Sequence, residues 1–283
     1  MGADDELTLA VDIGGTKLAA ALADRHGKLF GRRQVATPVD DPWPALAALV
    51  GDVLAEGAVP VVCGVGCGGP MDADTVSPLN ISGWRRFPLR ARLSELTGLP
   101  TVVENDAKAL ALGEGWLGAA AGEHHFLAMV VSTGVGGGIV LDGRLLDGRL
   151  GNAGHIGHVV VEPEGRACTC GGRGCLEAEA SGGAIAAITG RPAAEAPDEV
   201  VERTGTLVGR AVASVANLLD LRLAVVGGSV ALGFGEPFFV AARAEVGRRA
   251  RLDFSAGTVV EPAGLGDEGP LVGAAAVAWR SRR

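Results

Sequence analysis

The 283-residue chain is acidic and rich in apolar residues, with 48% hydrophobic residues and a formal net charge of −8. Its length and apolar content suffice for a sizeable core in one large domain or two smaller ones, and we expect two lobes. The negative charge provides no basic stripe to neutralise phosphates, which argues against DNA or RNA as a partner. No apolar run reaches the ~18 residues of a membrane span, and the start MGADDELTLA does not read as a secretory leader, so we expect a cytoplasmic protein.

A glycine turn joins two apolar runs near the N-terminus. Residues 7–13 alternate and are rich in β-branched side chains, and residues 18–23 continue the pattern after Gly14 and Gly15, which predicts a β-hairpin. The same plan recurs as a strand at 126–132, a turn at 133–138 and a second strand at 139–141. We therefore expect an internal duplication.

The other elements alternate between strands and helices. Strands are expected at 59–65, 101–104 and 223–226, and helices at 45–56, 89–97, from about 107, 208–219, 236–249 and 271–279. This alternation predicts an α/β sheet in each lobe. The last helix is expected to pack on the first lobe.

The glycine turns are candidate phosphate sites, because turns without side chains expose backbone N–H groups to an anion. A single such turn is also typical of an ordinary hairpin, but a second turn and a third glycine pair after an apolar strand favour nucleotide binding. Asp12 would bind Mg²⁺, and the third glycine pair would contact adenosine. The expected nucleotide contacts are Asp12, Gly14, Gly15, Thr16, Lys17, Ser132, Thr133, Gly134, Gly227 and Gly228.

The sequences DIGGTK, STGVGG and VVGGS resemble the ATPase core shared by actin, hexokinase and the heat-shock ATPases, which has two ribonuclease-H-like lobes. A Walker A sequence is absent, and no Rossmann GxGxxG follows the first strand. The resemblance implies a two-lobed α/β fold, with the first lobe at 1–107 plus 269–283 and the second at 108–268.

Glu104, Asn105 and Asp106 end a short strand just before a helix. Asn and Asp are preferred helix caps, so capping is the simplest role for this position. A kinase acting on a hydroxyl, however, needs a carboxylate that orients the hydroxyl and accepts its proton. We therefore expect Asp106 to be the catalytic base and Asn105 to bind a neighbouring sugar hydroxyl.

Three cysteines and a histidine crowd into eighteen positions of a glycine-rich segment. Such a set suits structural, tetrahedral Zn²⁺, because four protein ligands leave no open position. The alternative is a group of buried thiols with a surface histidine. Cys63 and Cys67 lie in an apolar run and are expected to be small buried residues. The expected metal ligands are His158, Cys168, Cys170 and Cys175.

Taken together, DIGGTK, END, STGVGGG, AGHIGH, CTCGGRGCLE and VVGGS resemble the ROK family, named for repressor, open reading frame and kinase. The resemblance covers nearly the whole chain. It implies a hexokinase-like fold with a structural zinc loop, and a homodimeric kinase that transfers the γ-phosphoryl group of ATP to the 6-hydroxyl of a hexose or N-acetylhexosamine. The implied sugar contacts are Gly69, Asn80, Asn105, Asp106, His158 and Glu177.

One position departs from the usual family pattern. Most ROK kinases have Glu in AGEIGH where this chain has His155, and the form AGHIGH is similar to that of bacterial N-acetylmannosamine kinases. We expect His155 to contact the sugar and to favour a 2-acetamido sugar, because a neutral imidazole can donate a hydrogen bond to the acetyl carbonyl. Glucose and other amino sugars remain alternatives.

Two other classes of protein are alternatives to a kinase. Sugar-responsive ROK repressors carry an N-terminal helix-turn-helix domain, and the eleven residues before Asp12 do not accommodate one. A non-catalytic sugar-binding protein would be expected to lack the base or a phosphate turn, whereas Asp106 and both turns are intact. The sequence therefore favours an enzyme.

Overall fold

A computed structural model describes residues 6–282, which form two compact units. Unit 1 contains the chain up to Gly118, the segment Asp147–Ala153 and the chain from Leu265 onward, and unit 2 contains Ala119–Leu146 and Gly154–Gly264. The expected boundaries, 107/108 and 268/269, differ from this division. Residues 108–118 belong with unit 1 because their helix packs along the C-terminal helix of that unit.

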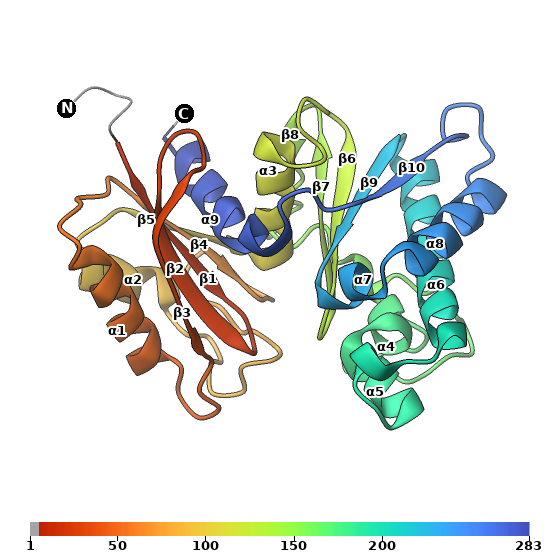
Figure 1. Cartoon of the computed structure of the whole chain (residues 1–283), viewed down its shortest axis with the longest axis horizontal. Coiled ribbons are helices and arrows are strands. Elements are labelled where there is room, and N and C mark those ends of the chain that lie inside the picture. The colour runs from red at the N-terminus through yellow and green to blue at the C-terminus, as the bar shows by residue number, and fades with distance from the viewer. Residues whose placement is uncertain (1–5, 283) are drawn as a thin grey trace. The chain divides into compact units, whose positions relative to one another are not determined.

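Unit 1 is built on a five-stranded sheet with the order β3-β2-β1-β4-β5 (Figure 1). The antiparallel pairing of β1 with β2 confirms the predicted hairpin, while β4 and β5 continue the sheet parallel to β1. The strand expected at 59–65 starts only after Pro60, which has no N–H to donate to a ladder. The strands are β1 (Thr8–Ile13), β2 (Lys17–Ala23), β3 (Leu29–Ala36), β4 (Cys63–Cys67) and β5 (Thr101–Asn105).

Helices cover both faces of this sheet. On one face α1 (Trp43–Leu54) and α2 (Leu89–Thr97) bury leucines and valines in a shared core with β1, β2 and β4. On the other face lies α9 (Gly269–Arg280), next to α3 (Asp106–Leu117). A Cβ atom at Gly64 would lie 2.1 Å from the carbonyl oxygen of Ala274, so glycine is required where α9 crosses β4. The expected packing of the last helix on the first lobe is confirmed.

Unit 2 repeats the sheet of unit 1. Its order, read from the antiparallel end, is β8-β7-β6-β9-β10, so again three antiparallel neighbours are followed by two parallel strands. The shared topology supports the predicted duplication. The strands are β6 (Phe126–Val131), β7 (Val135–Leu141), β8 (Arg144–Leu145), β9 (Leu223–Gly227) and β10 (Val259–Pro262).

The second glycine turn is shorter than the sequence suggested. Gly136, Gly137 and Gly138 do not form a turn but pair with β6 as part of β7. A Cβ atom at Gly137 would lie 2.9 Å from the Ile156 side chain and 3.2 Å from the Gly154 carbonyl oxygen. Gly137 is therefore needed for close packing on β7, and the turn itself is Ser132–Gly134.

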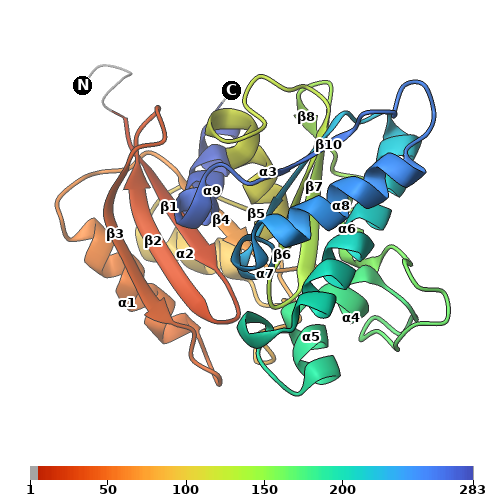
Figure 2. The same cartoon turned by 45° about the vertical axis from the view of Figure 1, so that its right-hand side comes forward.

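Five α-helices of unit 2 accompany the second sheet (Figure 2). The longest, α6, begins at Asp198, ten residues before the expected start, and packs closely on α8. Cβ atoms at Gly205 and Gly209 would lie 2.3 and 2.4 Å from carbonyl oxygens of α8, so both glycines permit that contact. Within residues 6–282, no helix is long and apolar enough to cross a membrane. The helices are α4 (Leu176–Ala180), α5 (Gly182–Thr189), α6 (Asp198–Leu219), α7 (Ser229–Phe234) and α8 (Glu236–Arg249).

Candidate active site

The expected base lies at the junction of β5 and α3 in unit 1. Asn105 is the N-cap of α3, because its Oδ1 accepts hydrogen bonds from the N–H groups of Ala107 at 3.1 Å and Lys108 at 3.3 Å. Asp106 Oδ1 also accepts from the Ala107 N–H, at 2.8 Å. Asn105 is therefore the main cap, and its amide NH₂ can still donate to a ligand. The other carboxylate oxygen of Asp106, Oδ2, would lie 4.0 Å from a Cβ atom at Gly68.

Two carboxylates, the buried Asp12 and the half-buried Asp106, lie together in unit 1. Burial raises the pKa of Asp12 to about 7; the negative charge of Asp106 adds to this rise and Lys17 opposes it. Burial also raises the pKa of Asp106, against the effect of the Ala107 N–H. A Cβ atom at Gly66 would lie 3.6 Å from Asp12 Oδ1 and 3.7 Å from Asp106 Cα. The pair offers an oxygen ligand for a divalent cation and a carboxylate of increased basicity.

Asn80 lies close to the same carboxylates. A Cβ atom at Gly68 would lie 3.5 Å from Asn80 Oδ1 and 4.0 Å from Asp106 Oδ2, and one at Gly15 would lie 2.6 Å from Asn80 Nδ2. The proximity follows from topology, since the carboxyl ends of the parallel strands β1, β4 and β5 meet at one edge of the sheet. The structure thus brings the expected base, the first phosphate turn and a candidate sugar contact together.

Side chains that the sequence analysis did not single out hold this arrangement. Thr37 Oγ1 donates to the Gly14 carbonyl at 2.7 Å and closes the first phosphate turn. The amide of Asn152 bridges the main chain of Met71, accepting from its N–H at 3.4 Å and donating to its carbonyl at 3.1 Å. Met71 follows Gly69 by two residues, so Asn152 supports the loop that contains this expected sugar contact. Neither residue has a local sequence signal.

Lys108 is a buried cation on the first turn of α3, with 1% of its surface exposed. Its ammonium group lies 3.2 Å from Glu104 and 3.0 Å from Asp147, and donates to the Gly151 carbonyl at 2.9 Å. Lys108 therefore joins the segment 147–153 to the helix that begins at Asp106. The i, i+4 spacing of Glu104 and Lys108 was the available sequence signal.

The second phosphate turn is hydrogen-bonded within unit 2 to the N-terminus of α5. The N–H groups of Gly182 and Gly183 donate to the carbonyls of Ser132 at 2.7 Å and Thr133 at 3.3 Å. Ser132 Oγ lies 2.9 Å from the hydroxyl of Ser229, the residue that follows the third glycine pair. A Cβ atom at Gly228, where φ is 95°, would lie 2.4 Å from a carbonyl oxygen. The second and third glycine turns thus form one cluster.

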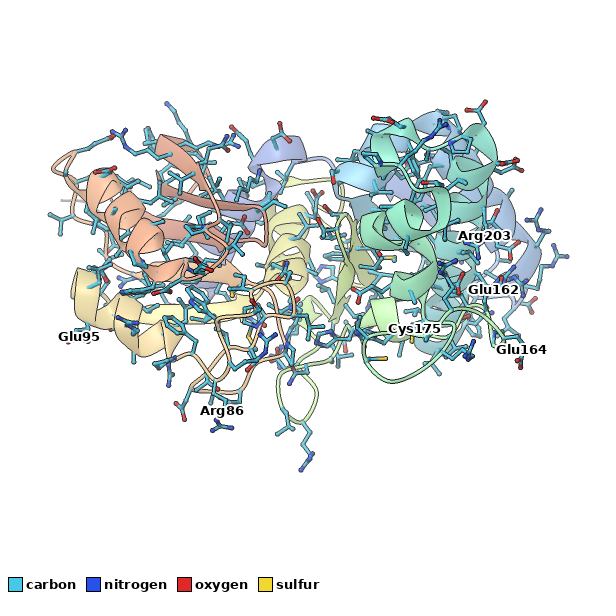
Figure 3. The ribbon with its side chains drawn as sticks, turned by 90° about the horizontal axis from the view of Figure 1, so that it is seen from below. Arg86, Glu95, Glu162, Glu164, Cys175 and Arg203 are labelled. Carbon is cyan, nitrogen blue, oxygen red and sulfur yellow. The ribbon has the colours of Figure 1, made fainter. Side chains whose placement is uncertain are left out.

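The cysteine and histidine cluster is also assembled in unit 2. One ligand atom from each of the four expected residues lies within 4.8 Å of all the others. Cys170 Sγ is 3.7 Å from Cys175 Sγ, and Cys168 Sγ is 3.7 Å from His158 Nδ1. Tetrahedral Zn–S bonds of about 2.3 Å place sulfur atoms roughly 3.8 Å apart, so the spacing fits Zn²⁺. Figure 3 labels Cys175 next to α4.

The remaining cysteines behave as expected. Cys63 and Cys67 are fully buried in β4, and burial raises the pKa of the Cys63 thiol to about 12. Thiols in such surroundings are unreactive.

Glu177 and His155 lie near this cluster in unit 2. Glu177 Oε2 accepts a hydrogen bond from the Val135 N–H at 2.9 Å, directly after the second phosphate turn. The imidazole rings of His155 and His158 are 6.1 Å apart, centre to centre. Because His158 Nδ1 faces the cysteines, its Nε2 is the ring nitrogen left for another partner.

Each unit thus gathers its own set of the expected residues. Unit 1 has Asp12, Gly14, Gly15, Thr16, Lys17, Gly69, Asn80, Asn105 and Asp106, and unit 2 has Ser132, Thr133, Gly134, His155, His158, Cys168, Cys170, Cys175, Glu177, Gly227 and Gly228.

Comparison with known proteins finds ROK sugar kinases that are similar to this chain over most of its length. The profile of the ROK family matches residues 8–281. An N-acetylmannosamine kinase of Escherichia fergusonii is 39% identical over 247 residues, which cover 81% of this chain and 84% of the relative. A ROK family glucokinase from Streptomyces griseus, solved in complex with glucose and AMPPNP, has a TM-score of 0.85 at 33% identity, covering 97% and 99% of the two chains. A ROK hexokinase from Thermus thermophilus has a TM-score of 0.84 at 36% identity, covering 98% and 99%.

Proposed function

Because the chain belongs to the ROK family, we propose that it is an ATP-dependent kinase acting on the 6-hydroxyl of a hexose or N-acetylhexosamine. The observation that carries the proposal is the pair of Asp106 and Asp12 at the carboxyl edge of the unit 1 sheet, both with a raised pKa. The first candidate substrate is N-acetylmannosamine, supported by the AGHIGH sequence and by relatives of that name at 39% identity. Glucose is the second, supported by the glucokinase complex.

In the proposed reaction Asp106 accepts the proton of the sugar hydroxyl as its oxygen bonds to the γ-phosphorus. The bond from that phosphorus to the oxygen bridging to ADP breaks, and ADP leaves with the electron pair. Asp106 must be ionised to accept the proton, so we expect the rate to rise with pH through its raised pKa. Asp12 would hold the Mg²⁺ that accompanies ATP and screens the phosphate charge.

Unit 2 would contribute the other nucleotide contacts and the zinc loop. Backbone N–H groups of the turn Ser132–Gly134 are suited to phosphate oxygens, and the pair Gly227 and Gly228 to adenosine. His158 and the three cysteines would hold structural Zn²⁺. With Nδ1 on the metal, His158 would carry its proton on Nε2 and donate it to a sugar oxygen. Glu177 and His155 would complete the sugar contacts of this unit.

The proposal is tested by ADP release with N-acetylmannosamine, glucose, N-acetylglucosamine and mannose. At least one sugar should support turnover, and Asp106→Asn should lower kcat for it by ~10²- to 10⁴-fold. Asp52→Asn, which removes an exposed carboxylate on α1, is the matched control and should retain wild-type turnover. Sugar binding without ADP release would instead favour a regulator, and near-normal turnover of folded Asp106→Asn would remove this residue from the mechanism.

A further inference from the structure

A single carboxylate in unit 2 touches the second phosphate turn and also belongs to the expected sugar contacts. Glu177 Oε2 accepts the Val135 N–H at 2.9 Å. A Cβ atom at Gly134 would lie 2.8 Å from the same oxygen, so the turn packs directly on the carboxylate. No other described residue is expected to serve both the sugar and this turn.

The main chain around Glu177 is firmly held. The Leu176 N–H donates to the Val159 carbonyl at 2.9 Å, and the Leu176 side chain is fully buried. Two residues later Glu179, 2% exposed, binds Arg203 at 2.6 Å. The helix start that carries Glu177 therefore has little freedom, and movement of the carboxylate is confined to its own side chain.

We propose that Glu177 couples sugar binding to nucleotide binding. A carboxylate has two acceptor oxygens, and with Oε2 on Val135 the second, Oε1, can accept a sugar hydroxyl. A sugar held there fixes the carboxylate, which in turn fixes the Val135 N–H and the preceding turn Ser132–Gly134. The turn is then ordered before the phosphates arrive, so the nucleotide loses less conformational entropy on binding. This inference rests on the proposed kinase function.

The coupling has a reciprocal signature. If the sugar tightens nucleotide binding by some factor, the nucleotide must tighten sugar binding by the same factor. We expect a factor of about 10, within the usual range for coupled sites. If Glu177 only supported the turn, its removal would weaken nucleotide binding by the same factor with and without sugar.

The test measures the dissociation constant of AMPPNP by calorimetry with and without a saturating panel sugar, and of the sugar with and without AMPPNP. In the wild type both constants should fall about 10-fold when the second ligand is present. Glu177→Gln loses one of the two acceptor oxygens, and the factor should drop below about 2-fold. Glu164→Gln, an exposed carboxylate of the same unit (Figure 3), is the control and should keep the wild-type factor.

Gly134→Ala tests the same contact from the side of the turn, because its new Cβ would lie 2.8 Å from Glu177 Oε2 and must displace the carboxylate from the turn. The new Cβ would meet only Glu177, and the glycine has no left-handed φ, so the alanine conflicts with nothing else in unit 2. Its coupling factor should also fall below about 2-fold. Hydrogen exchange of residues 132–136 should slow on adding sugar to the wild type and stay unchanged in both variants.

The outcomes separate the inference from the proposed function. If neither ligand binds the wild type, the proposed function fails. If both bind and ADP is released, but the wild type shows no coupling or both variants keep it, the role of Glu177 is refuted and the kinase stands.

Discussion

Replacing Asp12 by Asn is expected to stabilise unit 1 while abolishing phosphoryl transfer. Asp12 is 7% exposed and its pKa is raised from 3.8 to about 7, first by burial and then by the charge of Asp106. A group whose pKa is raised on folding binds its proton more tightly in the folded state. The stabilisation that this proton gives the folded state is therefore complete below the pKa of Asp12 in the unfolded chain. It is lost as the pH rises through the pKa of Asp12 in the folded protein.

The magnitude follows from the size of the shift. Each pKa unit corresponds to about 1.4 kcal/mol. Asp12 therefore costs the ligand-free protein about 4 kcal/mol at pH 8, where it is ionised, and about 2 kcal/mol at pH 5, where folding must take up a proton. Asn resembles the protonated acid and carries no such cost. The gain in unfolding free energy from Asp12→Asn should thus be larger at pH 8 than at pH 5 by about 2 kcal/mol.

Urea denaturation followed by tryptophan fluorescence reports on the unfolding of unit 1. The four tryptophans of the chain, Trp43, Trp84, Trp116 and Trp279, all belong to unit 1. The experiment compares wild type, Asp12→Asn and the exposed-site control Asp52→Asn at both pH values, without nucleotide. A pH-independent difference, or destabilisation by Asp12→Asn at pH 8, would refute the assigned cost of this buried charge.

Three further changes test other parts of the structure. Cys170→Ser should lower the zinc content of the purified protein, measured by metal analysis, and should weaken sugar binding, because structural zinc couples its binding to local folding. A wild-type protein that phosphorylates sugar without zinc would contradict this prediction. His155→Glu should shift the ratio of kcat/KM for N-acetylmannosamine over glucose towards glucose by about one to two decades, and an unchanged ratio would remove His155 as a selector. Lys108→Met should lower the unfolding free energy by about 2 kcal/mol because it leaves Glu104 and Gly151 without their cation, whereas Lys108→Arg should lose less.

Features with a local signal in the sequence were predicted well. The hairpin at Gly14 and Gly15 follows from alternation and a turn pair, and the apolar face of 271–279 indicated a helix that packs on the first lobe. The cysteine and histidine cluster was also foreseen, because its four members lie within eighteen residues and the loop between them is short.

Features that depend on contacts between distant residues were missed. Gly136–Gly138 suggested a turn, but all three lie in β7, and the small size of Gly137 permits packing against Gly154 and Ile156, which only the folded chain reveals. Thr37, Asn152 and Lys108 act on partners 23, 81 and up to 43 residues away. Single polar residues of this kind look like ordinary surface positions until the strands and loops are in place.

The position of α9 has a consequence for the order in which the chain folds during synthesis. Domains usually fold as they emerge, the N-terminal one first. Here all strands and helices of unit 2 have been synthesised by Gly264, whereas the sheet of unit 1 keeps one apolar face uncovered until residues 269–280 have left the ribosome. The unit that contains Asp12 and Asp106 is therefore begun first and completed last, and a nascent chain arrested near residue 264 would expose Ala10, Ala19 and Ala21 to chaperones.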